Sequence, residues 1–273
     1  GVLAGLCDTL AAALDESGET TSLQTVSYSD TTWALLFNAA EGSVFQNQQL
    51  RQALAGIARE NADVPSSGLY AAAKGLVPEG LTVDGLDYRE TAGDPLPTIP
   101  EPKALYLAAR QGMATSDFSG VTLLLPKNAG LGELADQINS AWQKECSLFF
   151  SVEEVEQDEF DARIAAGKYT IALAPIRAEG GSVYQMLQQF TAEGGSLTGY
   201  ADTVYADRLA LSAQQTGKDR CALLAQCERQ LLESCTVVPL MAQQKRLLLA
   251  NGVRDLVFDP FFPVLDLTWA KMS

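Results

Sequence analysis

The sequence predicts an α/β fold in which helices flank a mainly parallel sheet. Between residues 121 and 175, short apolar runs suited to buried strands alternate with amphipathic helical patterns. A strand–helix–strand–helix–strand order implies right-handed crossovers and parallel neighbouring strands. The expected strands are Val121–Leu125, Ser147–Val152 and Tyr169–Ala174, and the helices between them lie around Leu134 and Ile138 and around Phe160 and Ile164, the second ending at Gly167.

The rest of the chain adds further helices and strands at apolar spacings. Residues 61–102 are loop-rich and close with a proline-dense run that favours extended backbone. Helices are expected at Leu3–Leu14, Gln46–Glu60, Lys103–Gln111, Val183–Phe190, Asp202–Ala213 and Lys218–Cys235, and strands at Trp33–Phe37, Val237–Met241 and Arg246–Leu249.

Composition excludes several classes of function. The 273 residues carry 34 acidic and 19 basic side chains, a formal charge of −15, which disfavours nucleic acid and anionic membrane surfaces as partners. The chain contains no histidine, so Ser-His-Asp triads and His-ligated zinc sites are ruled out. It also lacks a glycine-rich phosphate loop of the Walker type and a GxGxxG motif. We expect a binding protein without a cofactor or metal, and not an enzyme.

The cysteines are expected to be free thiols. Their number, five, is odd, and no two have CxxC spacing. Cys221, Cys227 and Cys235 fall among the apolar positions of a predicted helix, where they serve as small hydrophobic residues. This pattern fits either a reducing compartment or export by a cell that lives without oxygen.

The beginning of the chain resembles neither a signal peptide nor a start site. Gly1–Leu14 has no basic leader and no initiating methionine, and no apolar run approaches the ~18–20 residues that cross a bilayer. We therefore interpret the sequence as a piece of a longer protein.

Several stretches resemble, in the same order, the bacterial extracellular solute-binding proteins of family 5, which include the oligopeptide- and dipeptide-binding proteins of ABC transporters. The similar segments are TWALLFN from Thr32, FQNQQLRQALAGIARE from Phe45, PKA from Pro102, GVTLLLPKNAGLGELADQINSAWQKE from Gly120, FDARIAAGKYTIAL from Phe160 and the stretch from Thr198 to Leu240 that ends in VVPL. Thr170 stands where the family usually has an aspartate. The resemblance covers nearly the whole chain, although none of its motifs is specific alone.

The resemblance implies a periplasmic-binding-protein-like lobe and a role in uptake. Residues 1–28 would end a first lobe, residues 29–255 would form most of the second lobe, and residues 256–273 would return to the first. A peptide or similar small solute would be enclosed between the lobes and passed to the transporter's permease subunits. The protein would be a monomer on the extracellular face of the membrane or in the periplasm, and any lipid anchor of such a lipoprotein would lie outside this sequence.

The resemblance also suggests ligand contacts. In the family, the loop after the strand that matches Tyr169–Ala174 carries an acidic residue that pairs with the peptide's amino terminus. Glu179 is the matching candidate, with Arg177 as a partner for a ligand carboxylate and Ile176 beside them. These residues have alternative interpretations, since Glu179 and Arg177 can equally be solvated loop charges.

Three more candidates lie on or just after the strand at residues 33–37. Asn38 either lines the cleft or satisfies backbone groups where the chain changes lobes. Trp33 offers an apolar wall with one donor, or packs in the core, and Phe37 adjoins Asn38. Arg51 matches a family arginine and is expected to be structural, paired with a carboxylate.

Two other functions remain open on the sequence. The first is a ligand-sensing domain of a cytosolic transcription regulator, which would suit unpaired cysteines. The second is an α/β enzyme that uses Asp158, Glu159 and Asp161 as acid and base groups. Acidic residues are, however, favoured at a helix start in any case.

Overall fold

The computed structural model describes residues 23–64, 68–127 and 129–250, and beyond them four two-residue strands. These strands are β9 (Val253–Arg254), β10 (Val257–Phe258), β11 (Leu265–Asp266) and β12 (Lys271–Met272), paired as β9 with β12 and β10 with β11. The helix expected at Leu3–Leu14 lies outside the described residues.

A six-stranded sheet forms the centre of the fold, in the order β2-β8-β1-β7-β5-β6. The unit β6-β5-β7 is parallel, as the alternation of strands and helices predicted. Four strands, β5 to β8, run in one direction, while β1 and β2 run in the other, so that three of the five pairings are antiparallel. The predicted α/β class is confirmed. The strands are β1 (Leu23–Phe37), β2 (Tyr70–Ala72), β5 (Thr122–Pro126), β6 (Ser151–Val155), β7 (Ile171–Arg177) and β8 (Val237–Ala250).

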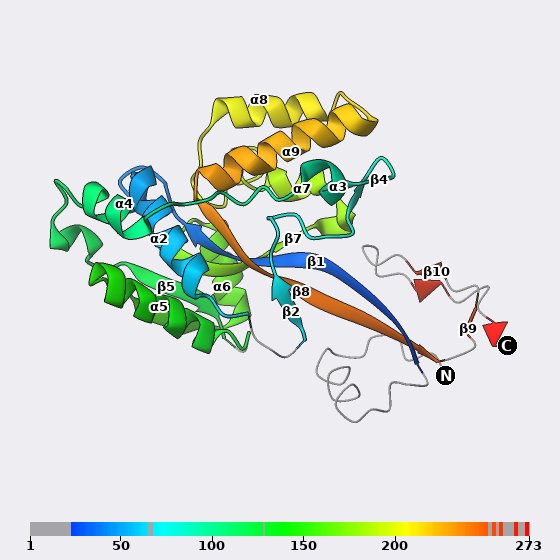
Figure 1. Ribbon diagram of the computed structural model, residues 1–273, viewed down its shortest axis with the longest axis horizontal. Coiled ribbons are helices and arrows are strands. Elements are labelled where there is room, and N and C mark those ends of the chain that lie inside the picture. The colour runs from blue at the N-terminus through cyan, green and yellow to red at the C-terminus, as the bar shows by residue number, and fades with distance from the viewer. Residues whose placement is uncertain are drawn as a thin grey trace.

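Strands β1 and β8 are much longer than the sequence pattern indicated. They pair from Leu36↔Val237 to Leu23↔Ala250 and extend from the sheet as a two-stranded ribbon (Figure 1). The two late strands expected at 237–241 and 246–249 are therefore one strand. The polar interval between them looks like a turn in the sequence, but its pairing with β1 keeps it extended.

Two helical layers cover the sheet, because alternate residues of each strand point to opposite faces. Trp33, Leu35 and Phe37 pack in one cluster with α2, α4 and α5, whereas Ala34 and Leu36 pack in the other with α3, α6, α7, α8 and α9. The helices are α2 (Gln48–Asn61), α3 (Tyr88–Ala92), α4 (Pro102–Ala109), α5 (Gly132–Cys146), α6 (Gln157–Ala165), α7 (Val183–Gln188), α8 (Thr203–Ser212) and α9 (Gly217–Glu233).

Several predicted boundaries shift for local reasons. β6 starts at Ser151 and not at Ser147, because Ser147 adopts a left-handed conformation after α5. In addition, the buried amide of Asn139 holds both the N–H and the carbonyl of Phe150 (2.9 and 2.6 Å). β7 starts at Ile171, since the Thr170 hydroxyl accepts from the N–H of Thr122 and donates to its carbonyl, both at 2.8 Å.

The stretch between residues 61 and 102 is more structured than expected. It contains β2, the hairpin of β3 (Thr82–Val83) and β4 (Leu86–Asp87), and α3. These elements are too short for periodicity to identify them, and tertiary pairing defines them.

Arg51 is structural as expected, but its partner is not a carboxylate. Its side chain donates to the carbonyls of Ser234 (2.9 Å), Phe45 (2.5 Å) and Gln46 (3.1 Å). Burial lowers the pKa of this guanidinium. Arg51 therefore links α2 to the end of α9.

We expect all five cysteines to titrate as free thiols after unfolding without reductant. The four described cysteines (Cys146, Cys221, Cys227 and Cys235) are buried and unpaired. Burial raises the pKa of Cys146 and Cys235 to about 11 and that of Cys227 to about 12, so native thiols should react slowly near pH 8. The measurement is reaction with a thiol reagent before and after denaturation, and finding only one thiol after denaturation would contradict the expectation.

Candidate functional site

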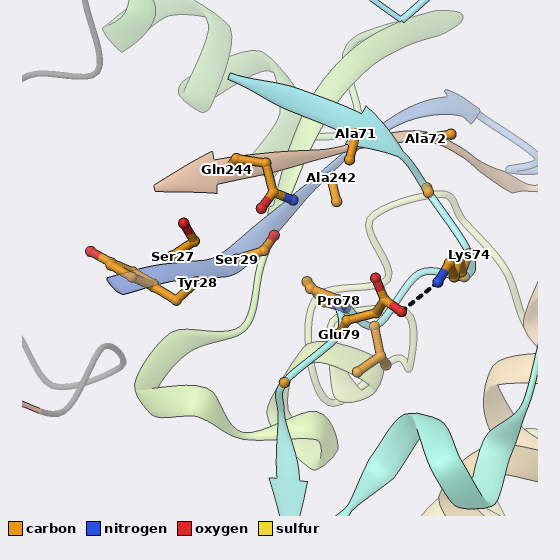
Figure 2. Close-up of a pocket in the computed structure, with 14 residues that line it drawn as sticks. Ser27, Tyr28, Ser29, Ala71, Ala72, Lys74, Pro78, Glu79, Ala242 and Gln244 are labelled. Atoms are coloured by element: carbon orange, nitrogen blue, oxygen red, sulfur yellow. Dashed lines mark hydrogen bonds and ion pairs between the residues drawn. The ribbon is translucent and has the colours of Figure 1, made fainter. Parts of the chain in front are cut away.

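A cavity of about 250 Å³ lies where the β1–β8 ribbon leaves the sheet (Figure 2). We call it the ribbon pocket. Residues 27–29 of β1 form one wall, and Ala242 and Gln244 of β8 form the next. Residues 71–75 and 77–80, on β2 and in the loop after it, complete the lining. The pocket thus depends on three strands that are far apart in the sequence.

The described residues that line the ribbon pocket carry no unpaired charge. Its charged residues, Lys74 and Glu79, pair with each other at 2.6 Å on the exposed side of the loop (Figure 2). Most of the other lining residues are alanine, glycine, valine or proline. Ser29 is buried, and its hydroxyl has no hydrogen-bond partner in the part of the chain that the structure describes. The pocket is small, neutral and partly polar.

A buried ion pair holds the loop that forms one wall of this pocket. The Glu228 carboxylate, fully buried on α9, accepts hydrogen bonds from Arg89 Nη2 (2.9 Å), the Tyr88 hydroxyl (2.9 Å) and the Val77 N–H (2.9 Å). Arg89 also donates to the Val77 carbonyl. A Cβ on Gly75 would lie 2.6 Å from the Glu228 carboxylate, so a larger residue there would displace the Glu228 and Arg89 side chains. We call this group the Glu228 clamp.

The electrostatic surroundings of Tyr88 favour its hydrogen bond to the Glu228 carboxylate. Burial, reinforced by the neighbouring Glu228, raises the pKa of Tyr88 well above its usual value. The phenol therefore remains protonated and available as a donor. With three kinds of donor on one carboxylate, the buried charge of Glu228 is fully compensated.

The second part of the site is the loop of residues 177–182 after β7, which we call the β7 loop. It adjoins the ribbon pocket, since the N–H of Ala178 donates to the Asp30 carbonyl (2.8 Å), and Ser29, the residue before Asp30, lines the pocket. Lys245 on β8 pairs with the Asp30 carboxylate at 2.6 Å. Both glycines of the loop, Gly180 and Gly181, have positive φ angles, which allow its tight turn.

Arg177 and Glu179 are exposed on this loop. Within the described part of the chain, neither side chain forms an ion pair, so both charges are available to an external partner. Ile176, in contrast, is buried in the core beneath them.

Among the described strands, none pairs with one edge of β7 over its second half. β5 pairs with β7 only at Ile171 and Ala172, whereas β1 pairs with β7 as far as Arg177. An extended ligand can in principle add to such an edge as a further strand.

Pro175 restricts hydrogen bonding at that edge. Alternate residues of a strand direct their backbone groups to opposite sides, and Ala178 directs its N–H to β1. Pro175 and Arg177 therefore face the open edge, where proline has a carbonyl but no N–H. The Arg177 carbonyl already accepts from Gln189 Nε2 (3.1 Å). An added strand would find few free main-chain groups here.

The candidates Trp33, Phe37 and Asn38 lie away from the ribbon pocket. Phe37 is fully buried, 5.1 Å from Phe45 between ring centroids, and offers no surface in this structure. Asn38 satisfies backbone groups, since its side chain donates to the carbonyls of Gly167 and Tyr169, both at 2.9 Å. Trp33 is packed in the core, although its indole N–H has no partner among the residues that the structure describes. Ligand contacts by these three residues remain predictions.

Sequence reasoning missed Ser29, Gln244 and the Glu228 clamp. No local pattern distinguishes Ser29 or Gln244, because their proximity depends on strand pairing. Glu228 did leave a signal: it lies four residues after Leu224 and three before Leu231, on the apolar face of its helix. A carboxylate at such a position requires a buried partner.

No group of three or more potential metal-ligating side chains comes together among the described residues. Among the helices that the structure describes, none combines the length and the apolar character needed to cross a bilayer.

No protein-family model and no curated protein matches this sequence. The fold, however, matches solved structures of bacterial peptide-binding proteins. The substrate-binding domain of an oligopeptide ABC transporter from Bacillus anthracis superposes with a TM-score of 0.73 at 17% identity, over 97% of this chain and 57% of that one. OppA of Listeria monocytogenes, solved bound to peptide, gives 0.72 at 18% identity, over 95% and 52%. The pheromone receptor PrgZ gives 0.75 at 17% identity, over 95% and 52%.

This chain therefore has the fold of the oligopeptide-binding proteins, as the sequence resemblance implied. It spans only about half the length of the structures it matches, which fits a carboxy-terminal part.

We expect Glu228→Gln to destabilise the protein strongly. The substitution removes the counter-charge of Arg89, whose side chain is only 10% exposed, and breaking a buried pair typically costs ~3–5 kcal/mol. Glu79→Gln is the matched control: its ion pair with Lys74 is exposed and should contribute at most ~1 kcal/mol. Denaturant unfolding measures both free energies, and equal small losses would show that the clamp is not important for stability.

Proposed function

We propose that this chain forms most of one lobe of an ABC-transporter substrate-binding protein, which binds peptides or similar small solutes for uptake. The main support is the coincidence of two features: the fold is that of oligopeptide-binding proteins, and the ribbon pocket and the β7 loop adjoin at the base of the ribbon. We propose no catalytic role and no cofactor.

The proposed lobe comprises residues 29–255. Residues 1–28 and 256–273 are assigned to the first lobe, whose remainder lies outside this sequence. A register irregularity between Tyr28 and Thr31 interrupts the β1–β8 pairing close to the proposed boundary and supports it. The ligand would sit between the lobes and be enclosed when they close.

Within this lobe, Glu179 is proposed to pair with the ammonium group of a peptide, and Arg177 with a ligand carboxylate. Their exposure and their lack of described ion pairs support these roles. Ile176 supports the loop from the core, and Trp33, Phe37 and Asn38 are proposed to support the site from the inner end of β1, whose outer end carries the chain toward the first lobe. Because few main-chain groups are free at the open edge of β7, recognition is proposed to depend mainly on these side-chain contacts.

The protein is proposed to act as a monomer outside the cytoplasmic membrane, in the periplasm or on the extracellular face, with transporter permease subunits as partners. Any anchor, as in a lipoprotein, belongs to a segment outside this sequence. Two of the matching structures are named as an ABC-transporter substrate-binding domain and a pheromone receptor, so we do not propose the transcription-regulator alternative.

Glu179→Gln should weaken the binding of free peptides to the complete two-lobed protein by about thirtyfold or more. Leaving a buried ammonium unpaired typically costs ~2–5 kcal/mol. N-acetylated peptides, which carry no ammonium, should bind the parent and the variant alike. Calorimetry with both peptide forms measures the difference.

Glu133→Gln is the control, because Glu133 is an exposed carboxylate in the first turn of α5, on the other face of the sheet. If Glu179→Gln binds both peptide forms as the parent does, Glu179 is a solvated loop residue.

The chain alone should bind the same peptides far more weakly than the complete protein does. A single lobe presents one wall of the site, and much of the ligand's burial comes from closure. Circular dichroism first establishes that the chain is folded, and calorimetry then compares the two affinities. Equal affinities would place the whole site within this chain and contradict the two-lobed proposal.

A further inference from the structure

We propose that the ribbon pocket selects an uncharged hydrogen-bonding group of the ligand, an amide or a hydroxyl, through Ser29 and Gln244. This inference rests on the proposed function and specifies the ligand chemistry for one part of the site. Four properties of the ribbon pocket support it: its paired charges, its polar side chains without described partners, its volume and its rigid loop wall.

The charge balance disfavours an ionised ligand group. Lys74 and Glu79, the charged residues of the lining, neutralise each other at 2.6 Å. An ionised group entering among alanine and glycine surfaces would lose hydration without gaining a counter-charge, unless it broke this pair.

The unmet polar groups disfavour a purely apolar ligand group. The Ser29 hydroxyl is buried and finds no hydrogen-bond partner among the described residues, so it is free to bond to a polar group that enters the pocket. The Gln244 side chain has no described partner, and Figure 2 shows its amide and the Ser29 hydroxyl directed toward the same space. Together they offer donors and acceptors, which suits an amide or a hydroxyl.

The size and rigidity of the pocket fit one side chain of a larger ligand. A volume of about 250 Å³ lies below the ~300–1,000 Å³ of pockets that enclose a whole ligand. The Glu228 clamp holds Val77, and with it the loop wall, in place before a ligand arrives. A preformed wall spares the ligand the cost of ordering the loop.

The test uses the complete protein and a set of trialanine-based peptides that carry Asn, Asp, Lys or Leu at each position in turn. At one position, the Asn peptide should bind about tenfold more tightly than the Asp, Lys and Leu peptides, a difference of ~1.4 kcal/mol. Ser29→Ala and Gln244→Leu should each reduce this preference to about threefold or less. Trialanine, whose methyl side chains cannot bond to Ser29 or Gln244, measures any general effect of each variant on binding.

Two matched controls separate the pocket from general effects. Gln243→Leu alters the adjacent residue of β8, which does not line the pocket, and Ser119→Ala removes an exposed hydroxyl after a turn elsewhere. Both should keep the preference for Asn. Ser29→Ala should also keep the parent's unfolding midpoint, because it removes a buried hydroxyl that has no partner.

The outcomes distinguish this inference from the proposed function. If the parent binds peptides with no preference for Asn at any position, or if Ser29→Ala and Gln244→Leu keep the preference, the inference is wrong and the proposed function stands. A preference for Asp, Lys or Leu would likewise overturn it. If the parent binds none of the peptides, the proposal of peptide binding fails and the inference fails with it.

Discussion

The pairing of β1 with β8 is the constraint on which the rest of this structure depends. It joins residues more than two hundred positions apart, from Leu23↔Ala250 to Leu36↔Val237, across the middle of the sheet. The inner half of the pair carries apolar residues that face both helical layers. The outer half continues as a ribbon, and β2 adds to β8 beside it. A single pairing thus organises the core and two walls of the ribbon pocket.

The remaining wall depends on a polar interaction inside the core. Burial of Leu76 and Val77 attaches this loop to the core. The Glu228 carboxylate adds a second attachment, because it accepts from the main chain of Val77 and from two side chains of α3. The cost of burying its charge is offset only when all of these donors are present. The clamp therefore links the outer helices to the site.

The two parts of the site have complementary chemistry. The β7 loop presents opposite charges that are free of described ion pairs, whereas the charges of the ribbon pocket are already paired. Pro175 lacks an N–H and Gln189 occupies the Arg177 carbonyl, so the β7 edge has few hydrogen-bonding groups left for a ligand's main chain. A ligand held here would be recognised by its charged ends and by one neutral polar group. Recognition through side chains is more selective than the addition of a strand.

The sequence by itself determined the α/β class, the parallel unit of β5, β6 and β7, and most of the helices, because these follow from local periodicity and from the handedness of crossovers. It also indicated the β7 loop, through its resemblance to a family. Only the tertiary structure decided that β8 is one long strand, that Asn38 satisfies backbone carbonyls, and that Ser29 meets Gln244 in a pocket. Strand pairing between distant segments, and the partner of a buried charge such as Glu228, leave little trace in a local pattern. They depend on which surfaces the folded chain brings together.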